Sequence, residues 1–188
     1  MHVTLLADMG MPMIFVEWPL MIIALVPIIF IETVLIRRWM PLPLGKAFLG
    51  VGVANLLSTL VGVPLSWLCV LLVDGFLGAG LRSVALHYHW QLRGTPLAHV
   101  LFFFLNVAWG TGVGQYPYWF VPAAAAVLLV PCFYASVWLE RWVCARTWKQ
   151  LDPARVRSSV FRANLASYAL LFLGACGWAA YELHVHPL

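Results

Sequence analysis

Four long apolar stretches follow one another along the chain, and short polar or basic segments separate them. The stretches cover about 13–36, 47–73, 117–140 and 160–181. A helix that crosses a bilayer needs roughly 20 apolar residues, and each stretch is long enough. The second stretch contains Gly62 and Pro64, which predict a tilt or a kink. The pattern therefore predicts four transmembrane helices.

Two pairs of matching motifs indicate that the four helices are one hairpin used twice. Ala54–Ser58 reads ANLLS and Ala163–Ser167 reads ANLAS, at an offset of 109 positions. The stretches before them align Val34–Trp39 with Val137–Trp142 at an offset of 103, so the second loop is expected to be about six residues longer. Both hairpins then have the same orientation, and the repeat is parallel rather than inverted.

The segment 74–116 joins the two hairpins and has a different pattern from either. Its part up to Thr95 mixes charged and aromatic residues with leucines, which suits a helix lying in the membrane interface. The part 97–109 is very apolar, too short to span comfortably, and runs into a glycine-rich segment, which favours a re-entrant element. We therefore expect an all-α integral membrane protein with a single membrane domain, 1–188. Its parts are the first hairpin 13–73, the outer interfacial or re-entrant segment 74–116 and the second hairpin 117–182.

The composition excludes a soluble fold. Hydrophobic residues make up 63% of the 188 positions and charged residues only 10%, whereas a soluble domain carries roughly 25% charged residues. The formal net charge of +4 does not indicate a nucleic-acid partner, because the basic residues are few and stand beside apolar runs. They are better explained as signals of membrane topology.

Nine of the 11 Lys and Arg residues fall in two loops that four spans would place on one side of the membrane. Cytoplasmic loops carry an excess of these residues, so both loops are expected in the cytoplasm and both termini outside it. We expect a multi-pass protein of the bacterial cytoplasmic (inner) membrane, surrounded by the lipid bilayer. The nine residues are Arg37, Arg38, Lys46, Arg141, Arg146, Lys149, Arg155, Arg157 and Arg162.

Small residues mark one face of the second stretch. Gly50, Ala54, Ser58 and Gly62 recur every four positions, so they share one side of a helix. Small side chains let two membrane helices approach closely. This face is therefore predicted to pack against another helix.

Polar residues interrupt the apolar stretches at similar depth. Glu32 lies near the cytoplasmic end of the first stretch, and Asn55 follows in the second. A polar group in hydrocarbon needs a partner, because leaving it unsatisfied costs several kcal/mol. We expect Glu32 to pair with Asn55 or to reach toward Arg37 or Arg38. A proton or ion site around Glu32 is the alternative.

The second hairpin carries comparable polar residues. Ser136 and Glu140 precede its basic segment, and Asn164 and Ser167 follow it. Glu32 as one carboxylate, without a second deep acid, base or cation, is a thin basis for a transporter. The predicted polar layer, structural or ion-binding, comprises Glu32, Asn55, Ser58, Asn164 and Ser167.

All six histidines fall on the predicted outer side. His87 and His89 form an H-x-H pair, His184 and His186 form another, and His99 lies between the pairs. Histidines in such groups bind copper, zinc or haem iron. Alternate residues point together on a strand but not on a helix, so polar interfacial histidines are the preferred interpretation. No cofactor is favoured, and haem or copper is the alternative.

A resemblance to a protein family agrees with this interpretation. The combination of Pro27, Glu32, the Arg37–Arg38 stop, the motif Ala54–Thr59, and the following Gly62 and Pro64 resembles small multi-pass bacterial membrane proteins of uncharacterised function. The resemblance implies a multi-pass fold and no particular activity.

The sequence carries no recognised catalytic motif, with no P-loop, HExxH or GxSxG pattern. The leading hypothesis is a non-enzymatic membrane subunit or scaffold that packs against partner membrane proteins or copies of itself. The second is an oligomeric transporter of a small solute, protons or ions, built on Glu32, Asn55 and Asn164. The third is a redox-associated protein that holds haem or copper through the outer histidines.

Overall fold

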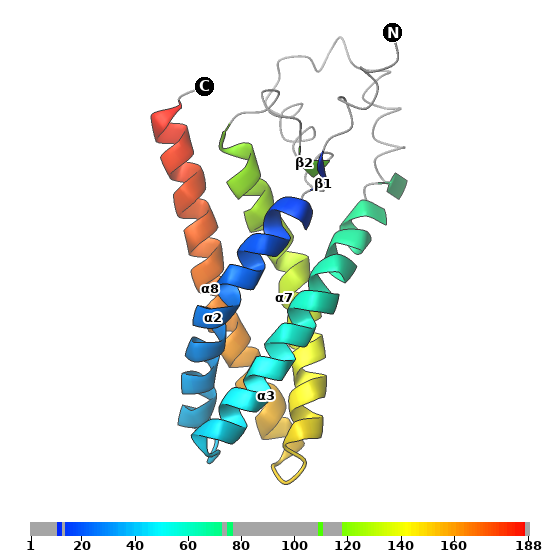
Figure 1. The fold of residues 1–188 in the computed structure, drawn as a ribbon, viewed down its shortest axis with the longest axis vertical. Coiled ribbons are helices and arrows are strands. Elements are labelled where there is room, and N and C mark those ends of the chain that lie inside the picture. The colour runs from blue at the N-terminus through cyan, green and yellow to red at the C-terminus, as the bar shows by residue number, and fades with distance from the viewer. Residues whose placement is uncertain (1–10, 13, 73–74, 77–108, 111–117, 187–188) are drawn as a thin grey trace.

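The computed structural model describes residues 11–12, 14–72, 75–76, 109–110 and 118–186. The described part of the chain is helical apart from one pair of two-residue strands (Figure 1). Most of the expected interfacial or re-entrant segment 74–116, including 97–108, lies outside the described residues. Within that segment Trp109–Gly110 forms strand β2, which pairs antiparallel with strand β1, Met11–Pro12.

Four long helices make up the described bundle. They are α2 (Ile14–Trp39), α3 (Leu44–Leu57) continued through the π-helical segment η1 (Ser58–Gly62) to Leu72, α7 (Phe120–Thr147) and α8 (Pro153–Val185). Three stretches in the described residues are long and apolar enough to cross a membrane: Leu44–Leu72, Phe120–Thr147 and Pro153–Val185. Helix α2 has 26 residues, with Arg37 and Arg38 in its last turn.

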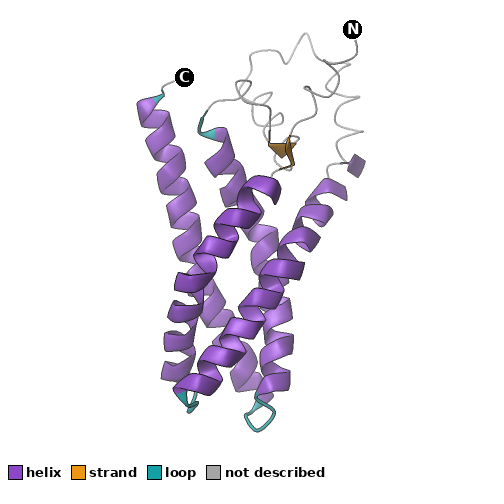
Figure 2. Cartoon of the chain, in the orientation of Figure 1, coloured by secondary structure: helices purple, strands orange, loops and turns teal. Residues whose placement is uncertain are grey.

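The helices form two pairs, α2 with α3 and α7 with α8, and each pair is joined by a tight turn. Both turns lie at the same end of the bundle, shown at the bottom of Figure 2. Helix α2 packs against α3 and α8, and helix α7 packs against the same two helices. Helices α2 and α7 therefore occupy diagonal corners of the bundle, with α3 and α8 between them.

The two turns differ in length by one residue, so the expected six-residue difference is wrong. The first turn covers 40–43 and the second 148–152. The alignment of Arg38 with Arg141 gave the wrong loop length, because the two residues are not equivalent. Arg38 stands one residue before the end of α2, and Arg141 stands six residues before the end of α7. The expected basic loops are mainly basic helix ends, since Lys149 alone of the nine basic residues lies in a turn.

Local hydrogen bonds explain where α8 begins and how the turns meet. The Asp152 side chain accepts from the backbone N–H groups of Ala154 and Arg155, and Pro153 occupies the first helical position. An aspartate cap followed by proline is a strong helix start. The Arg155 guanidinium donates to the Trp39 carbonyl through Nη2 at 2.7 Å and Nε at 3.2 Å. This contact ties the beginning of α8 to the end of α2.

The irregularity predicted around Gly62 and Pro64 takes the form of the π segment Ser58–Gly62. Pro64 has no backbone N–H and cannot donate to the residue one turn earlier, so the ordinary helical ladder is interrupted there. A π turn accommodates such an interruption, and π segments are frequent at functional sites.

Candidate functional site

Six polar side chains meet at one level of the bundle and form what we call the polar ring. All are buried, with between 0% and 4% of each residue exposed. Helices α2 and α7 each supply a glutamate, and α3 with η1 and α8 each supply an asparagine and a serine. The members are Glu32, Asn55, Ser58, Glu140, Asn164 and Ser167.

Glu32 binds both helices that flank α2. Asn55 Nδ2, on α3, donates to Glu32 Oε2 at 2.7 Å. On the other side, Ser167 Oγ of α8 lies 2.6 Å from Glu32 Oε1. One carboxyl group thus joins a helix of its own pair to a helix of the other pair.

Glu140 repeats this arrangement from the diagonal corner. Asn164 Nδ2, on α8, donates to Glu140 Oε2 at 2.6 Å. Ser58 Oγ, at the start of η1, lies 2.9 Å from Glu140 Oε1. Each glutamate is therefore bonded to the asparagine of its own pair and to the serine of the other pair.

Short-range bonds close the ring within α3 and α8. Ser58 Oγ lies 3.0 Å from the backbone carbonyl oxygen of Asn55, and Ser167 Oγ lies 3.0 Å from the backbone carbonyl oxygen of Asn164. The second amide hydrogen of each asparagine is also bonded, to the carbonyl of the residue four positions earlier, at 3.1 Å for Asn55 and 3.2 Å for Asn164. The three-residue spacing places asparagine and serine on one helix face, where they reach the two different carboxyl groups.

The ring lies at the same depth in both helix pairs. Glu32 stands seven residues before the end of α2 and Glu140 seven before the end of α7. Asn55 and Asn164 each stand eleven residues after the start of their helices. At 1.5 Å per residue, the ring is about 10 to 16 Å from the helix ends at the turns.

The treatment of Glu32 as the single deep carboxylate is wrong. Glu140 is buried because α7 continues to Thr147, beyond the expected end of the third stretch at 140. The offset of 103 hid the equivalence, whereas Glu32 and Glu140 are 108 positions apart and their asparagines 109. A signal was present in the sequence, since asparagine follows glutamate after 23 residues in one pair and 24 in the other, with serine three residues later in both.

Neither glutamate of the ring has a cationic partner among the described residues. In the described chain, one contact lies within ion-pair distance: His186 Nε2 stands 4.0 Å from Glu182 Oε2 at the far end of α8, and it is an ion pair only when the histidine is protonated. Arg37 and Arg38 belong to the last turn of α2, and the sequence-based expectation that Glu32 reaches toward them has no contact to support it in the described residues. The ring therefore consists of carboxyl, amide and hydroxyl groups.

Beside the ring, Ser136 and Tyr168 link α7 to α8. Their hydroxyl oxygens lie 2.7 Å apart. This bond stays within the second helix pair, and it offers a useful contrast to the serine–glutamate bonds that connect the two pairs.

The predicted small face of α3 packs against the second helix pair. Ala54 is completely buried, and a Cβ added at Gly62 would stand 3.4 Å from the Leu139 side chain of α7. The tightest approach is at Gly50, where an added Cβ would stand 2.5 Å from the Trp148 indole. Trp148 is itself 1% exposed and its Nε1 donates to the Lys46 carbonyl at 3.4 Å.

The histidine hypothesis rests mainly on residues outside the described structure, namely His87, His89 and His99. His184 is exposed near the end of α8, and the His186 ring stacks on Tyr118 with centroids 4.2 Å apart. In the described part of the chain no three His, Cys, Asp or Glu side chains gather as a metal site.

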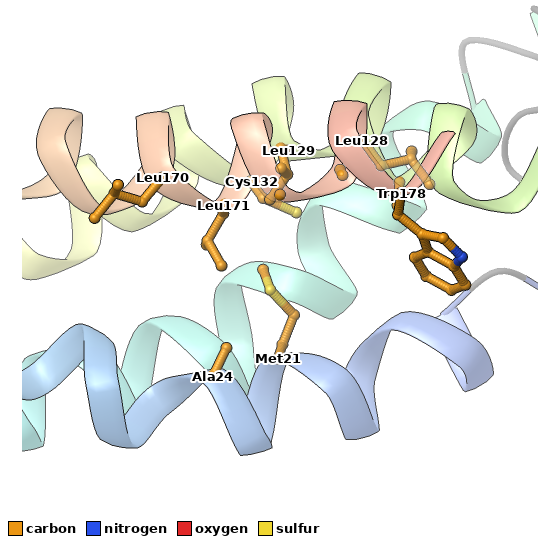
Figure 3. Close-up of a pocket in the computed structure, with 11 residues that line it drawn as sticks. Met21, Ala24, Leu128, Leu129, Cys132, Leu170, Leu171 and Trp178 are labelled. Atoms are coloured by element: carbon orange, nitrogen blue, oxygen red, sulfur yellow. The ribbon is translucent and has the colours of Figure 1, made fainter. Parts of the chain in front are cut away.

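An apolar pocket of about 290 Å³ opens between α2, α7 and α8, on the side of the ring away from the turns. Figure 3 shows Met21 of α2 and Leu171 of α8 pointing toward each other across it. The other lining residues include Cys132 and Trp178, and the Trp178 indole donates to Glu182 at 2.9 Å. The pocket is therefore apolar, and none of its lining residues belongs to the polar ring.

Comparison with known protein families, curated proteins and solved structures returns no match.

Proposed function

We propose that the chain is a non-enzymatic integral membrane subunit or scaffold, and that the polar ring locks its two helix pairs together to present an outer apolar surface to partner membrane proteins. The observation that carries this proposal is the closure of the ring. Both carboxyl groups and both asparagine amides are bonded inside it. Polar groups bonded to one another in this way hold helices together in hydrocarbon, and among the described ring atoms Asn164 Oδ1 alone is buried without a partner.

We propose four spans, with α2 as the first. Its 26 residues extend about 39 Å, enough to cross the hydrocarbon core. Its packing against α3 and α8 supports this, because α3 and α8 both belong to stretches long and apolar enough to span.

We also propose that the two helix pairs are parallel copies of one hairpin. The support is the matching depth of the two glutamates and of the two asparagines, together with the matching bonds that each pair makes. Offsets of 108 and 109 positions relate the equivalent residues.

The orientation proposed for the bundle places both turns in the cytoplasm of a bacterium and the other helix ends outside. All nine basic residues of the expected loops lie in the turns or in helix segments next to them, which favours this orientation. Single cysteines at the exposed positions Pro41 and Gln150, without the four native cysteines, should label only after permeabilisation. A cysteine at exposed His184 should label on intact cells. The reverse pattern would refute the orientation.

The scaffold role is supported by the apolar surface beyond the ring. Leu173 and Tyr181 of α8 are 66% and 62% exposed. Purification of the tagged protein in a mild detergent, followed by native mass measurement, should recover it with another membrane protein or as an oligomer. A protein that migrates as a lone monomer at native expression levels would contradict the role.

A proton or ion transporter is the second candidate, and the presence of a second buried acid favours it. Two glutamates in hydrocarbon are a recurrent feature of proton and ion pathways. If Glu32 and Glu140 carry protons across the membrane, Gln at either position should abolish pH-driven flux in proteoliposomes while the protein still assembles. Flux absent from the wild-type protein, or unchanged in both variants, leaves the locking role as the explanation of the ring.

A further inference from the structure

Each of the two serine hydroxyls in the polar ring contacts two oxygen atoms but has only one hydrogen to donate. Ser167 Oγ lies 2.6 Å from Glu32 Oε1 and 3.0 Å from the Asn164 carbonyl. Ser58 Oγ lies 2.9 Å from Glu140 Oε1 and 3.0 Å from the Asn55 carbonyl. A hydroxyl donates once, and a carbonyl or an ionised carboxylate only accepts. With ionised glutamates, the single hydroxyl hydrogen of each serine would have to be shared between two acceptors.

A proton on each carboxyl group supplies the missing hydrogens. The acid O–H of Glu32 then donates to Ser167, and the Ser167 hydroxyl donates to the Asn164 carbonyl. Glu140 donates in the same way to Ser58, and Ser58 to the Asn55 carbonyl. The asparagine amides need no change, because each has two hydrogens and two acceptors. Every contact in the ring now contains one hydrogen.

The donors in this arrangement all run in one direction around the ring. Starting at Glu32, hydrogens point to Ser167, then to the Asn164 carbonyl, and from the Asn164 amide to Glu140. The second half repeats these steps through Ser58 and Asn55 back to Glu32. Within each half, the bonds from glutamate to serine and from serine to the asparagine backbone carbonyl follow one another and polarise each other. The side-chain amide of the same asparagine then makes a separate bond to the next glutamate.

The charges around the ring agree with neutral acids. The two carboxyl groups bind the same face of α3, three residues apart, so two anions would repel each other at close range. The described neighbours that titrate are Cys144 of α7, one turn from Glu140, and Tyr168 of α8, next to Ser167. Neither is a cation. The cations of α2 and α3 stand at the turn ends, at Arg37, Arg38 and Lys46. Arg141 follows Glu140 on α7, but its guanidinium donates to the Arg157 carbonyl and lies over the Phe161 ring.

We infer that Glu32 and Glu140 are both protonated in the closed bundle, each donating its proton to the serine of the other helix pair, so that two bound protons complete the lock. This inference rests on the proposed locking role and specifies its regulation. Without the two protons, each serine would have one hydrogen for two acceptors, and two anions would lie in one buried layer. Stability held by the protons is present at lower pH and lost as pH rises through their release.

Infrared spectroscopy of the protein in lipid tests the protonation directly. The wild-type protein at neutral pH should show the carbonyl stretch of a protonated carboxylic acid, shifted on exchange into deuterated water. E32Q and E140Q should each remove one contribution, and the double variant both. E182Q, which removes a carboxyl outside the ring, is the matched control and should leave the band unchanged. Absence of the band, or its survival in the double variant, would overturn the inference.

The stability of the same variants separates this inference from the locking role. Gln keeps an acceptor for asparagine and offers an N–H to serine, so E32Q and E140Q should assemble like the wild type. Raising the pH until the acid band disappears should lower the unfolding temperature of the wild type but not of the double Gln variant. Unchanged stability in the wild type would overturn the regulation. An acid band combined with wild-type stability of E32L would support the protonation and refute the lock.

Discussion

Helix α8 differs sharply on the two sides of Ser167. Between Pro153 and Ser167 it buries six residues, including Asn164, against the rest of the bundle, and beyond Ser167 it buries none. In Figure 1, α8 and α3 diverge toward the end away from the turns. The inner half of the helix is specified by contacts within the chain. The outer half is free to contact lipid or another protein.

The two halves of α8 differ in how many of their residues are held by contacts within the chain. The inner half of α8 contributes to the polar ring and packs into a core that contains Trp148 and Ala163. The outer half of α8 carries exposed leucines and two glycines, Gly174 and Gly177, with nothing near the position of a Cβ. A substitution should therefore matter for the fold in the inner half and for partner contact in the outer half.

The largest effect is expected at Gly50. A leucine there would collide with the buried Trp148 ring, which has no space to move, and overpacking costs about 1–3 kcal/mol or more. Gly52→Leu is the matched control, because an added Cβ at Gly52 meets nothing within 4 Å. Thermal unfolding in detergent should show a large loss for Gly50→Leu and little change for Gly52→Leu. Because leucine has the higher helix propensity, equal losses would show that the contact with Trp148 does not set the cost.

A somewhat smaller effect is expected for Glu32→Leu. The substitution leaves the Asn55 amide without its carboxyl acceptor and removes the contact between Glu32 and the Ser167 hydroxyl, and an unsatisfied buried group costs about 1–3 kcal/mol. Glu32→Gln should stay close to the wild type, because its amide reproduces both contacts. Chemical unfolding curves of the two variants provide the measurement, and a Gln variant as unstable as the Leu variant would show that the carboxyl group itself is needed.

The two serines of the ring should have matched, moderate effects. Ser58→Ala and Ser167→Ala each remove one bond between the helix pairs, and such bonds in membrane proteins average about 0.6 kcal/mol. Ser136→Ala removes a bond inside the second pair and serves as the comparison. If the ring is symmetric, the two ring variants should lose stability equally. Clearly unequal losses would mean that the helix pairs are not equivalent.

The smallest effect on stability is expected at Gly174. Leucine at this position has open space around it, so the free energy of unfolding should stay within about 0.5 kcal/mol of the wild type. Recovery of a co-purified partner is the informative readout. Lost recovery with an intact fold would place the partner on this face, whereas unchanged recovery would leave the face to lipid.

Much of the architecture was predictable, because hydrophobic runs of spanning length and helical spacing determine it. The helical class and the place of Asn55 beside Glu32 both follow from these patterns. Glu140 was missed for a physical reason. A basic residue usually marks the membrane boundary, but Arg141 stacks over the Phe161 ring at 5.1 Å and donates to the Arg157 carbonyl, so helix α7 continues past it. Hydropathy alone does not reveal such a contact.

The closure of the polar ring could not be derived from either half of the sequence. Each glutamate takes one partner from its own pair and one from the other, at separations of 135 and 82 residues for the two serine contacts. No local pattern encodes bonds of that range. They follow from the order of the helices around the bundle, with α2 and α7 on the diagonal.

A double-mutant cycle on Glu32 and Glu140 tests most directly whether the six residues act as one ring. The two glutamates share no partner atom, so independent sites would give additive losses within about 0.3–0.5 kcal/mol. A closed ring predicts a coupling of about 0.5 kcal/mol or more between Glu32→Leu and Glu140→Leu, because both glutamates bind α3 and α8 and opening one side loosens the helix contacts that hold the other. Glu32→Leu with Glu182→Leu, outside the ring, should be additive. Additive losses for Glu32 and Glu140 as well would contradict the ring.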